Sequence, residues 1–192
     1  MFINAAQLKV QRWVSENSFK KRLQYQLKHQ KLIKVRKGLY AQPDCRIGAS
    51  AEDRVQGGAL IYTPSYLSYE SVLAQAGVLF QRYGHATYAA PYTKTIQLPD
   101  YNQAFVFKRL PMALLSDLTG IVHTPQYMQA SPERAICDCL YHNLNYPFER
   151  LNVLDRDLLL RIGEMYAYYK PALYTRLLSL KTTPHATTTT HS

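Results

Sequence analysis

The spacing of apolar residues near the N-terminus is typical of an amphipathic helix. Phe19, Leu23 and Leu27 recur every four residues, so they share one side of a helix that advances about 100° per residue. The pattern predicts a helix over 19–30, and Ser18 is a suitable N-cap for it. A second helix is expected just before it, from a cap at Asn4 to about Trp13, with a turn at 15–18 between the two.

The residues that follow alternate in the manner of a strand. Ile33 and Val35 are apolar, whereas Lys34 and Arg36 are basic, which predicts a hairpin over 32–41 with an apolar side and a basic side. Gly38 supplies the permissive backbone that a tight turn needs. Helix, turn, helix and hairpin in this order predict a winged helix-turn-helix over residues 1–45.

The rest of the chain has a mixed pattern of helices and strands. Residues 43–50 are expected to form a linker, and Gly57 and Gly58 weaken the first helix beyond it. Ser68 and Ser131 are suitable helix caps. The predicted helices are 52–62, 69–76, 132–142, 155–169 and 171–180, and the predicted strands are 87–90, 93–97 and 104–110.

These patterns predict an α+β protein with two domains. A winged helix-turn-helix at 1–45 is followed, at 51–181, by a mixed domain of helices packed on a small antiparallel sheet. We expect the Thr-rich tail, 182–192, to be disordered because it has little to pack.

The distribution of charge points to a polyanionic partner. The chain has a net charge of +10, and residues 1–40 hold ten Lys/Arg and a single acid, Glu16, so almost all of the excess lies there. Such a concentration beside a helix-turn-helix pattern favours DNA binding. A basic helix face is also common on ordinary solvated surfaces, so the hairpin and the charge concentration are what favour DNA.

Candidate DNA-binding residues follow from the two faces of the 19–30 helix. Lys21 and Lys28 suit phosphates or guanine edges, and Gln24 suits an adenine edge. Tyr25 has two interpretations: it contacts the sugar–phosphate backbone, or it folds back into the core. The complete candidate set is Ser18, Lys20, Lys21, Gln24, Tyr25, Lys28, Lys34, Arg36 and Lys37.

Other chemistry has little support in the sequence. Asp138 and His142 lie one helical turn apart, but no nucleophile or metal cluster accompanies them, so we expect no enzyme activity, metal or cofactor. Cys45, Cys137 and Cys139 are odd in number and lack zinc spacing. With neither a signal peptide nor a long apolar run, we expect a cytoplasmic protein that does not enter a membrane. Tyr166, Tyr168 and Tyr169 either line a partner surface or pack between the last helices.

Three segments in order resemble a known family. The hairpin LIKVRKGLY (32–40) is similar to a wing of the form G-x-L-x-R-L-x-R-G-x-Y. PSYLSYESVL (64–73) is similar to Y-[IL]-S-x-E-S-A-L, and ASPERAICD (130–138) to A-x-P-E-[KR]-A-L-x-D, with the strand-like FVFKRL (105–110) between them. These patterns, which span about residues 5–142, resemble the AbiE-type antitoxins of bacterial abortive-infection (type IV toxin–antitoxin) systems.

The resemblance implies a repressor that binds its own operator DNA and counteracts a nucleotidyltransferase-like toxin, often without a tight complex. Two-fold operators favour a dimer or paired binding. The alternatives are a stand-alone winged-helix regulator whose C-terminal domain docks a ligand or a protein, and, with less support, a protein that binds RNA or the toxin directly.

Overall fold

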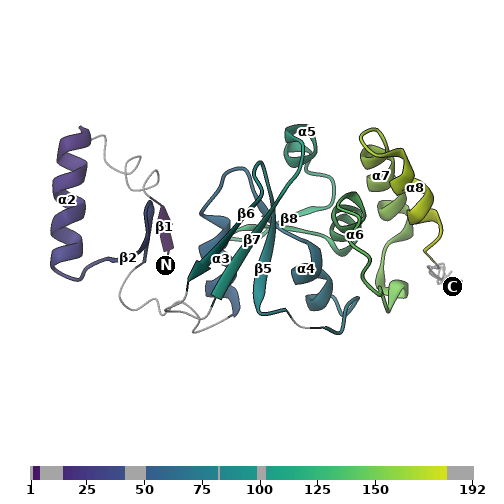
Figure 1. Cartoon of the computed structure of the whole chain (residues 1–192), viewed down its shortest axis with the longest axis horizontal. Coiled ribbons are helices and arrows are strands. Elements are labelled where there is room, and N and C mark those ends of the chain that lie inside the picture. The colour runs from purple at the N-terminus through teal and green to yellow at the C-terminus, as the bar shows by residue number, and fades with distance from the viewer. Residues whose placement is uncertain (1, 5–14, 42–50, 82, 99–102, 181–192) are drawn as a thin grey trace, which may run out of the picture.

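The computed structural model describes residues 2–4, 15–41, 51–81, 83–98 and 103–180 (Figure 1). Near the N-terminus it contains β1 (Phe2–Asn4), α2 (Glu16–Lys28), β2 (Ile33–Arg36) and β3 (Leu39–Ala41). The three strands form an antiparallel sheet in the order β1-β3-β2. The prediction that Asn4 caps a helix is wrong, because Asn4 pairs with Leu39 in this sheet. The remainder of that predicted helix, the predicted linker 43–50 and the tail 182–192 lie outside the described residues.

Helix α2 begins three residues earlier than predicted. Its N-cap is Ser15, whose side-chain oxygen accepts a hydrogen bond from the amide of Ser18 at 3.4 Å. Ser18 therefore lies inside the first turn and is not the cap. The helix ends at Lys28, two residues before the predicted Gln30, which has a left-handed φ of 51°. A left-handed residue is a common way to terminate a helix.

A small hydrophobic cluster holds α2 against the hairpin. Leu32 and Tyr40 are buried, and Leu23 and Leu27 of α2 pack on them. The predicted orientation of the hairpin is wrong at Ile33, which is 40% exposed. Leu32 takes the inward place because side chains alternate along a strand. The predicted turn is confirmed, since Gly38 has a φ of 85° between β2 and β3.

The C-terminal part contains a six-stranded sheet in the order β6-β7-β5-β4-β9-β8. Its strands are β4 (Tyr66–Leu67), β5 (His85–Ala90), β6 (Lys94–Leu98), β7 (Gln103–Arg109), β8 (Ile121–His123) and β9 (Met128–Ala130). The α+β class is confirmed, but the sheet is not the small antiparallel one predicted. It is mixed, because β5 pairs in parallel with β7, and β4 in parallel with β9.

Helices pack on this sheet and then on one another. They are α3 (Ala51–Ala59), α4 (Tyr69–Gln75), α5 (Met112–Ser116), α6 (Pro132–Tyr141), α7 (Arg156–Ala167) and α8 (Pro171–Leu178), with a 3₁₀ turn at Leu151–Val153. Figure 1 shows α6 between the sheet and the α7–α8 pair. Helix α6 contacts α4, α7 and α8, so it is the central helix of this part. None of the described helices combines the length and apolar character needed to traverse a lipid bilayer.

Of the two helix caps predicted in this part, one forms the expected hydrogen bond and the other does not. Ser131 accepts a hydrogen bond from the Arg134 amide and caps α6 as expected, with Pro132 at the first helical position. Ser68 stands at the start of α4, but its side chain makes no capping bond and donates to Asp138 instead. Helix α3 continues through Gly57 and Gly58. The Tyr88 side chain of β5 approaches Gly58 so closely that a Cβ has no room there, which explains the glycine at this position.

Candidate nucleic-acid interface

Helix α2 presents a continuous polar and basic face to solvent. Lys21, Gln24 and Lys28 are all exposed and lie on the side of the helix opposite Leu23 and Leu27. This division follows from the helical repeat, because residues spaced three and four apart share a face. The face therefore combines two ammonium groups and an amide, the donor types that bind phosphates and base edges in the major groove.

Tyr25 lies on the same outward face, which excludes one of its two interpretations. Its side chain is 54% exposed, so it does not fold back into the core. Its ring contacts that of His29 in a tilted arrangement with centroids 4.2 Å apart, and the Nζ of Lys31 lies 5.7 Å from the Tyr25 ring centre. The sequence prediction omitted His29 and Lys31, although the four-residue spacing of Tyr25 and His29 is a signal for such a contact.

The start of α2 carries two further candidates. Lys20 forms an exposed ion pair with Glu16, with the Nζ and Oε1 atoms 3.8 Å apart. Such a pair contributes little to stability and leaves the ammonium group within reach of a phosphate. The Ser18 hydroxyl accepts a hydrogen bond from that of Ser15 at 3.0 Å. Ser18 is exposed at this end of the helix, where the first amides favour anions.

The hairpin adds two lysines to the basic surface. Lys34 pairs with Tyr40 across β2 and β3, and directly opposed residues of an antiparallel pair project from the same face of a sheet. Because Tyr40 packs with Leu23 and Leu27, Lys34 projects on the side of the sheet where α2 lies. Its side chain is exposed, as is that of Lys37 in the turn. The Arg36 side chain lies outside the described residues.

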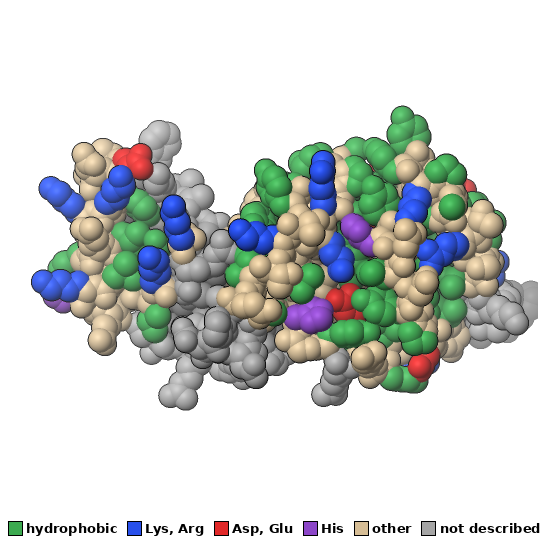
Figure 2. Space-filling model, in the orientation of Figure 1, with side chains coloured by type: hydrophobic (Ala, Val, Ile, Leu, Met, Phe, Trp, Pro, Cys, Tyr) green, Lys and Arg blue, Asp and Glu red, His purple; other side chains and the backbone are tan. Residues whose placement is uncertain are grey.

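Figure 2 shows Lys and Arg side chains spread over the α2 part of the molecule, with a single acidic group among them. The sequence explains this view, because Glu16 is the one acidic residue before Asp44. Cations so close together repel one another, and a polyanion relieves that repulsion. The described N-terminal part thus combines a basic face on a helix with an adjacent basic hairpin.

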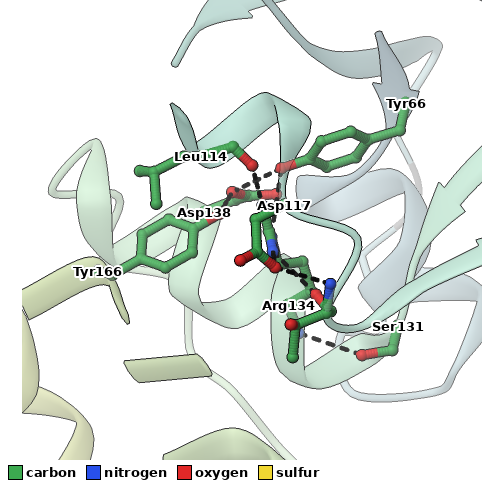
Figure 3. A network of polar contacts seen from close by, with 8 residues as sticks. Tyr66, Leu114, Asp117, Ser131, Arg134, Asp138 and Tyr166 are labelled. Carbon is green, nitrogen blue, oxygen red and sulfur yellow. Dashed lines mark hydrogen bonds and ion pairs between the residues drawn. The ribbon is translucent and has the colours of Figure 1, made fainter. Parts of the chain in front are cut away.

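A second constellation, a buried polar network around Asp138, lies inside the C-terminal part (Figure 3). The Asp138 carboxylate accepts hydrogen bonds from three hydroxyls: Ser68 Oγ at 2.5 Å, Tyr66 OH at 3.3 Å, and Tyr166 OH. Burial raises the pKa of Asp138, while Arg134 and the three hydroxyls act in the opposite direction. The network joins β4, α6 and α7.

Arg134 completes this network and is itself fully buried. Its Nε donates to Tyr66 OH at 3.3 Å, Nη1 to the Thr119 carbonyl at 2.8 Å, and Nη2 to the Leu114 carbonyl at 2.6 Å. These bonds satisfy the guanidinium, as burial of a charge requires. Arg134 thereby ties α6 to α5 and to the loop before β8. The network is packed on all sides and serves to hold these elements together.

Two motif segments that carry the family resemblance meet in this network. Tyr66 and Ser68 belong to one segment, and Arg134 and Asp138 to the other. In the first segment, the buried Glu70 accepts hydrogen bonds from Thr87, from His85 at 3.0 Å and from Tyr146 at 3.1 Å. The polar residues of the two motif segments therefore have a structural role inside the folded chain, as buried hydrogen-bonding partners.

Asp138 and His142, which lie one helical turn apart, do not form a joint site. The hydroxyls of the network surround Asp138, whereas His142 lies against Tyr69 with the two rings tilted and their centres 5.7 Å apart. Burial, together with Lys108 and Lys170, lowers the pKa of His142 to about 4. Cys137 and Cys139 are buried free thiols. Within the described residues, no group of three or more His, Cys, Asp or Glu is arranged to hold a metal.

No protein-family model matches this chain, and no curated protein matches it either. Its role is therefore inferred from its own residues and their arrangement.

Proposed function

We propose that this protein is a DNA-binding transcriptional regulator whose N-terminal part acts as a winged helix-turn-helix. Helix α2 is the recognition helix, and the β2–β3 hairpin is the wing. The observation that carries the proposal is the outward face of α2, where Lys21, Gln24, Tyr25 and Lys28 are exposed while Leu23 and Leu27 pack inward. A recognition helix needs both an anchored side and a side that presents donors to the major groove.

The roles of the candidate residues follow from their positions. Gln24 enters the groove, Lys21 and Lys28 bind phosphates at its edges, and Tyr25 contacts a sugar or a phosphate. Ser18 and Lys20, in the first turn of α2, bind a backbone phosphate. The wing residues Lys34, Arg36 and Lys37 contact phosphates or the adjacent minor groove. Two-fold operators then favour a dimer or two molecules bound side by side.

The family resemblance supports a more specific role. On this proposal the protein is the antitoxin of an abortive-infection system in the bacterial cytoplasm. It represses its own operon and opposes a nucleotidyltransferase-like toxin. It acts without catalysis of its own. A stand-alone regulator remains the second candidate, and the groove beside Arg176 described below favours a docking role for its C-terminal part.

A gel shift on the DNA upstream of the gene tests the binding proposal. The double variant Lys21→Ala/Arg36→Ala should bind at least about tenfold more weakly, because each lost cation removes a phosphate contact and its released counterion. The matched control is Lys94→Ala/Arg161→Ala, which removes two exposed cations of the C-terminal part. Equal affinity of the Lys21/Arg36 variant and the wild type would remove α2 and the wing from the interface.

The antitoxin role needs a separate experiment. A nucleotidyltransferase gene directly downstream of this one is expected, and co-expression should restore the growth of cells that express the toxin. Cells that stay inhibited, despite upstream DNA binding by the protein, would leave the stand-alone regulator as the better description.

A further inference from the structure

A surface groove lies between the chain that leaves α6 and the end of α8. It has a volume of about 380 Å³. Apolar side chains form much of its wall, among them Leu144, Pro147, Phe148 and Leu180, and Arg176 of α8 contributes a guanidinium. The groove is far in sequence from the proposed DNA-binding surface and has no part in the proposed binding of DNA.

Arg176, in the wall of the groove, and Lys170, beside it, share one neutral partner. Lys170 Nζ donates to Asn143 Oδ1 at 2.6 Å, and Arg176 Nη1 donates to the same oxygen at 3.5 Å. Arg176 Nη2 also donates to Asn145 Oδ1 at 2.5 Å. The ion pairs found within the described part of the chain include neither Lys170 nor Arg176. Amide oxygens carry only a partial charge, so a carboxylate is a stronger partner for both cations.

A purely structural role, the capping of a helix end, accounts for only one of these two cations. Lys170 Nζ donates to the Tyr141 carbonyl at 2.7 Å, so it caps the C-terminal end of α6, where a cation is favourable. Arg176 bonds to side-chain amides of the loop and to no carbonyl of that helix. Its guanidinium has five donors, and the contacts with Asn143 and Asn145 use two of them.

The α7–α8 pair also carries exposed side chains of the kinds found at protein-binding surfaces. Tyr168, at the end of α7, is 84% exposed, and Leu178 of α8 is 53% exposed, with Tyr169 also at the surface. Tyrosine and arginine are enriched where proteins meet. Figure 2 shows Lys and Arg side chains among hydrophobic ones over the α6–α8 end of the molecule.

We propose that this groove docks an acidic segment of a partner protein that also carries a large apolar side chain. Carboxylates of the segment bind Arg176 and Lys170 in place of the amide oxygens of Asn143 and Asn145. The apolar side chain enters the groove against Leu144, Phe148 and Leu180. This occupant satisfies both halves of the site, because the cations gain full negative charges and the apolar wall gains an apolar contact.

A nucleic-acid strand fits the same site less well. Phosphates would bind the two cations, and bases stack on aromatic rings. The wall residues Leu144, Pro147 and Leu180 are aliphatic, however, and offer a base no stacking partner. A small ligand also fits less well, since such ligands have most of their surface buried in a cleft, whereas Ser179 and Leu178 at this end of α8 are exposed. The acidic segment is therefore the occupant that the observations favour.

Selection from a display library of short random peptides, with the full-length protein as bait, tests this proposal. The peptides should be enriched in Asp and Glu next to Leu, Phe or Trp. A selected peptide, measured by fluorescence anisotropy, should bind Arg176→Glu at least about tenfold more weakly than wild type. The matched control is Arg161→Glu, an exposed arginine of α7 outside the groove lining, which should stay within about twofold.

Further variants separate the other occupants. Arg176→Gln, which removes the charge but keeps a polar side chain, should also weaken peptide binding. The result then does not depend on the folding of the Arg176→Glu variant alone. Upstream DNA should bind Arg176→Glu as well as it binds wild type. The proposal is wrong if the library yields no acidic peptides, or if Lys21→Glu rather than Arg176→Glu abolishes binding. It is equally wrong if Arg176→Glu weakens DNA binding and leaves the peptide unaffected.

Discussion

Arg134 and Asp138 lie one turn apart on α6 and are joined through a third residue, the hydroxyl of Tyr66. That hydroxyl accepts a hydrogen bond from Arg134 Nε and donates one to Asp138 Oδ1, both at 3.3 Å. Because Tyr66 belongs to the central strand β4, the relay fixes the rotation of α6 on the sheet. Tyr166 brings α7 to the same carboxylate.

The first prediction concerns the Tyr166 hydroxyl in this network. Tyr166→Phe should destabilise the protein by about 1–3 kcal/mol, because the variant removes a donor from a buried carboxylate. Tyr168→Phe is the matched control: its ring is 84% exposed, so the loss should stay below about 0.5 kcal/mol. Urea unfolding followed by circular dichroism measures the free energy of unfolding of both variants. Equal losses of stability would mean that the Tyr166 hydroxyl contributes no more than an exposed one.

The second prediction tests the contact between α3 and β5. A Cβ added at Gly58 would lie 2.3 Å from the Tyr88 hydroxyl. Alanine favours a helix over glycine by about 1 kcal/mol, but forcing the buried ring aside costs about 1–3 kcal/mol, so Gly58→Ala should be destabilising. Gly84→Ala, where no atom lies within 4 Å, should be close to neutral. A stabilised Gly58→Ala protein would refute the close contact.

The third prediction concerns pH. Burial, with Lys108 and Lys170 nearby, lowers the pKa of His142 from 6.5 to about 4 in the folded protein. Between these values the unfolded chain binds the proton and the folded chain does not, so stability present above pH 6.5 falls as the pH drops toward 4. The loss is at most about 1.4 kcal/mol per pH unit.

The variant His142→Gln isolates this contribution from that of the acidic residues. The difference in unfolding free energy between wild type and variant should depend on pH between 6.5 and 4, and it should be constant above that range. A difference that is independent of pH would show that His142 titrates normally in the folded state.

The fourth prediction follows from the corrected cap of α2. Ser15→Ala should weaken the first turn of the helix by about 1 kcal/mol, whereas Ser18→Ala keeps the bond from the Ser18 amide to Ser15 Oγ and should have a smaller effect. Hydrogen exchange of the α2 amides measures both variants. If exchange accelerates more in Ser18→Ala, Ser15 is not the cap.

Local patterns in the sequence were enough to predict most helices and the longer strands of the C-terminal part. Ser131 and Pro132 predicted the start of α6 because a cap and a proline act within one turn. The strands β4, β8 and β9 were not predicted, since each has only two or three residues, too few to show a clear alternation. The pairing of β4 with β9 also joins residues far apart in the chain. The parallel pairing of β5 with β7 depends on tertiary contacts in the same way.

The sequence likewise predicted one half of the candidate interface correctly and the other half incorrectly. Helical periodicity predicted which α2 residues face outward, because the apolar side chains Leu23 and Leu27 are enough to orient the helix. The same approach failed for the hairpin, where Leu32 rather than Ile33 is buried. A one-residue shift of a strand exchanges its two faces, and two adjacent apolar residues do not specify which one turns inward.

The salt dependence of binding to upstream DNA tests the central claim most directly. For wild type, the logarithm of the association constant should fall linearly with the logarithm of the salt concentration, as counterion release requires. Lys21→Ala/Lys28→Ala should reduce the steepness of that line by about 1.8, if each lysine contacts one phosphate. Lys94→Ala/Arg161→Ala should leave the slope unchanged. An unchanged slope in the Lys21/Lys28 variant would contradict the assignment of α2 as the DNA-binding helix.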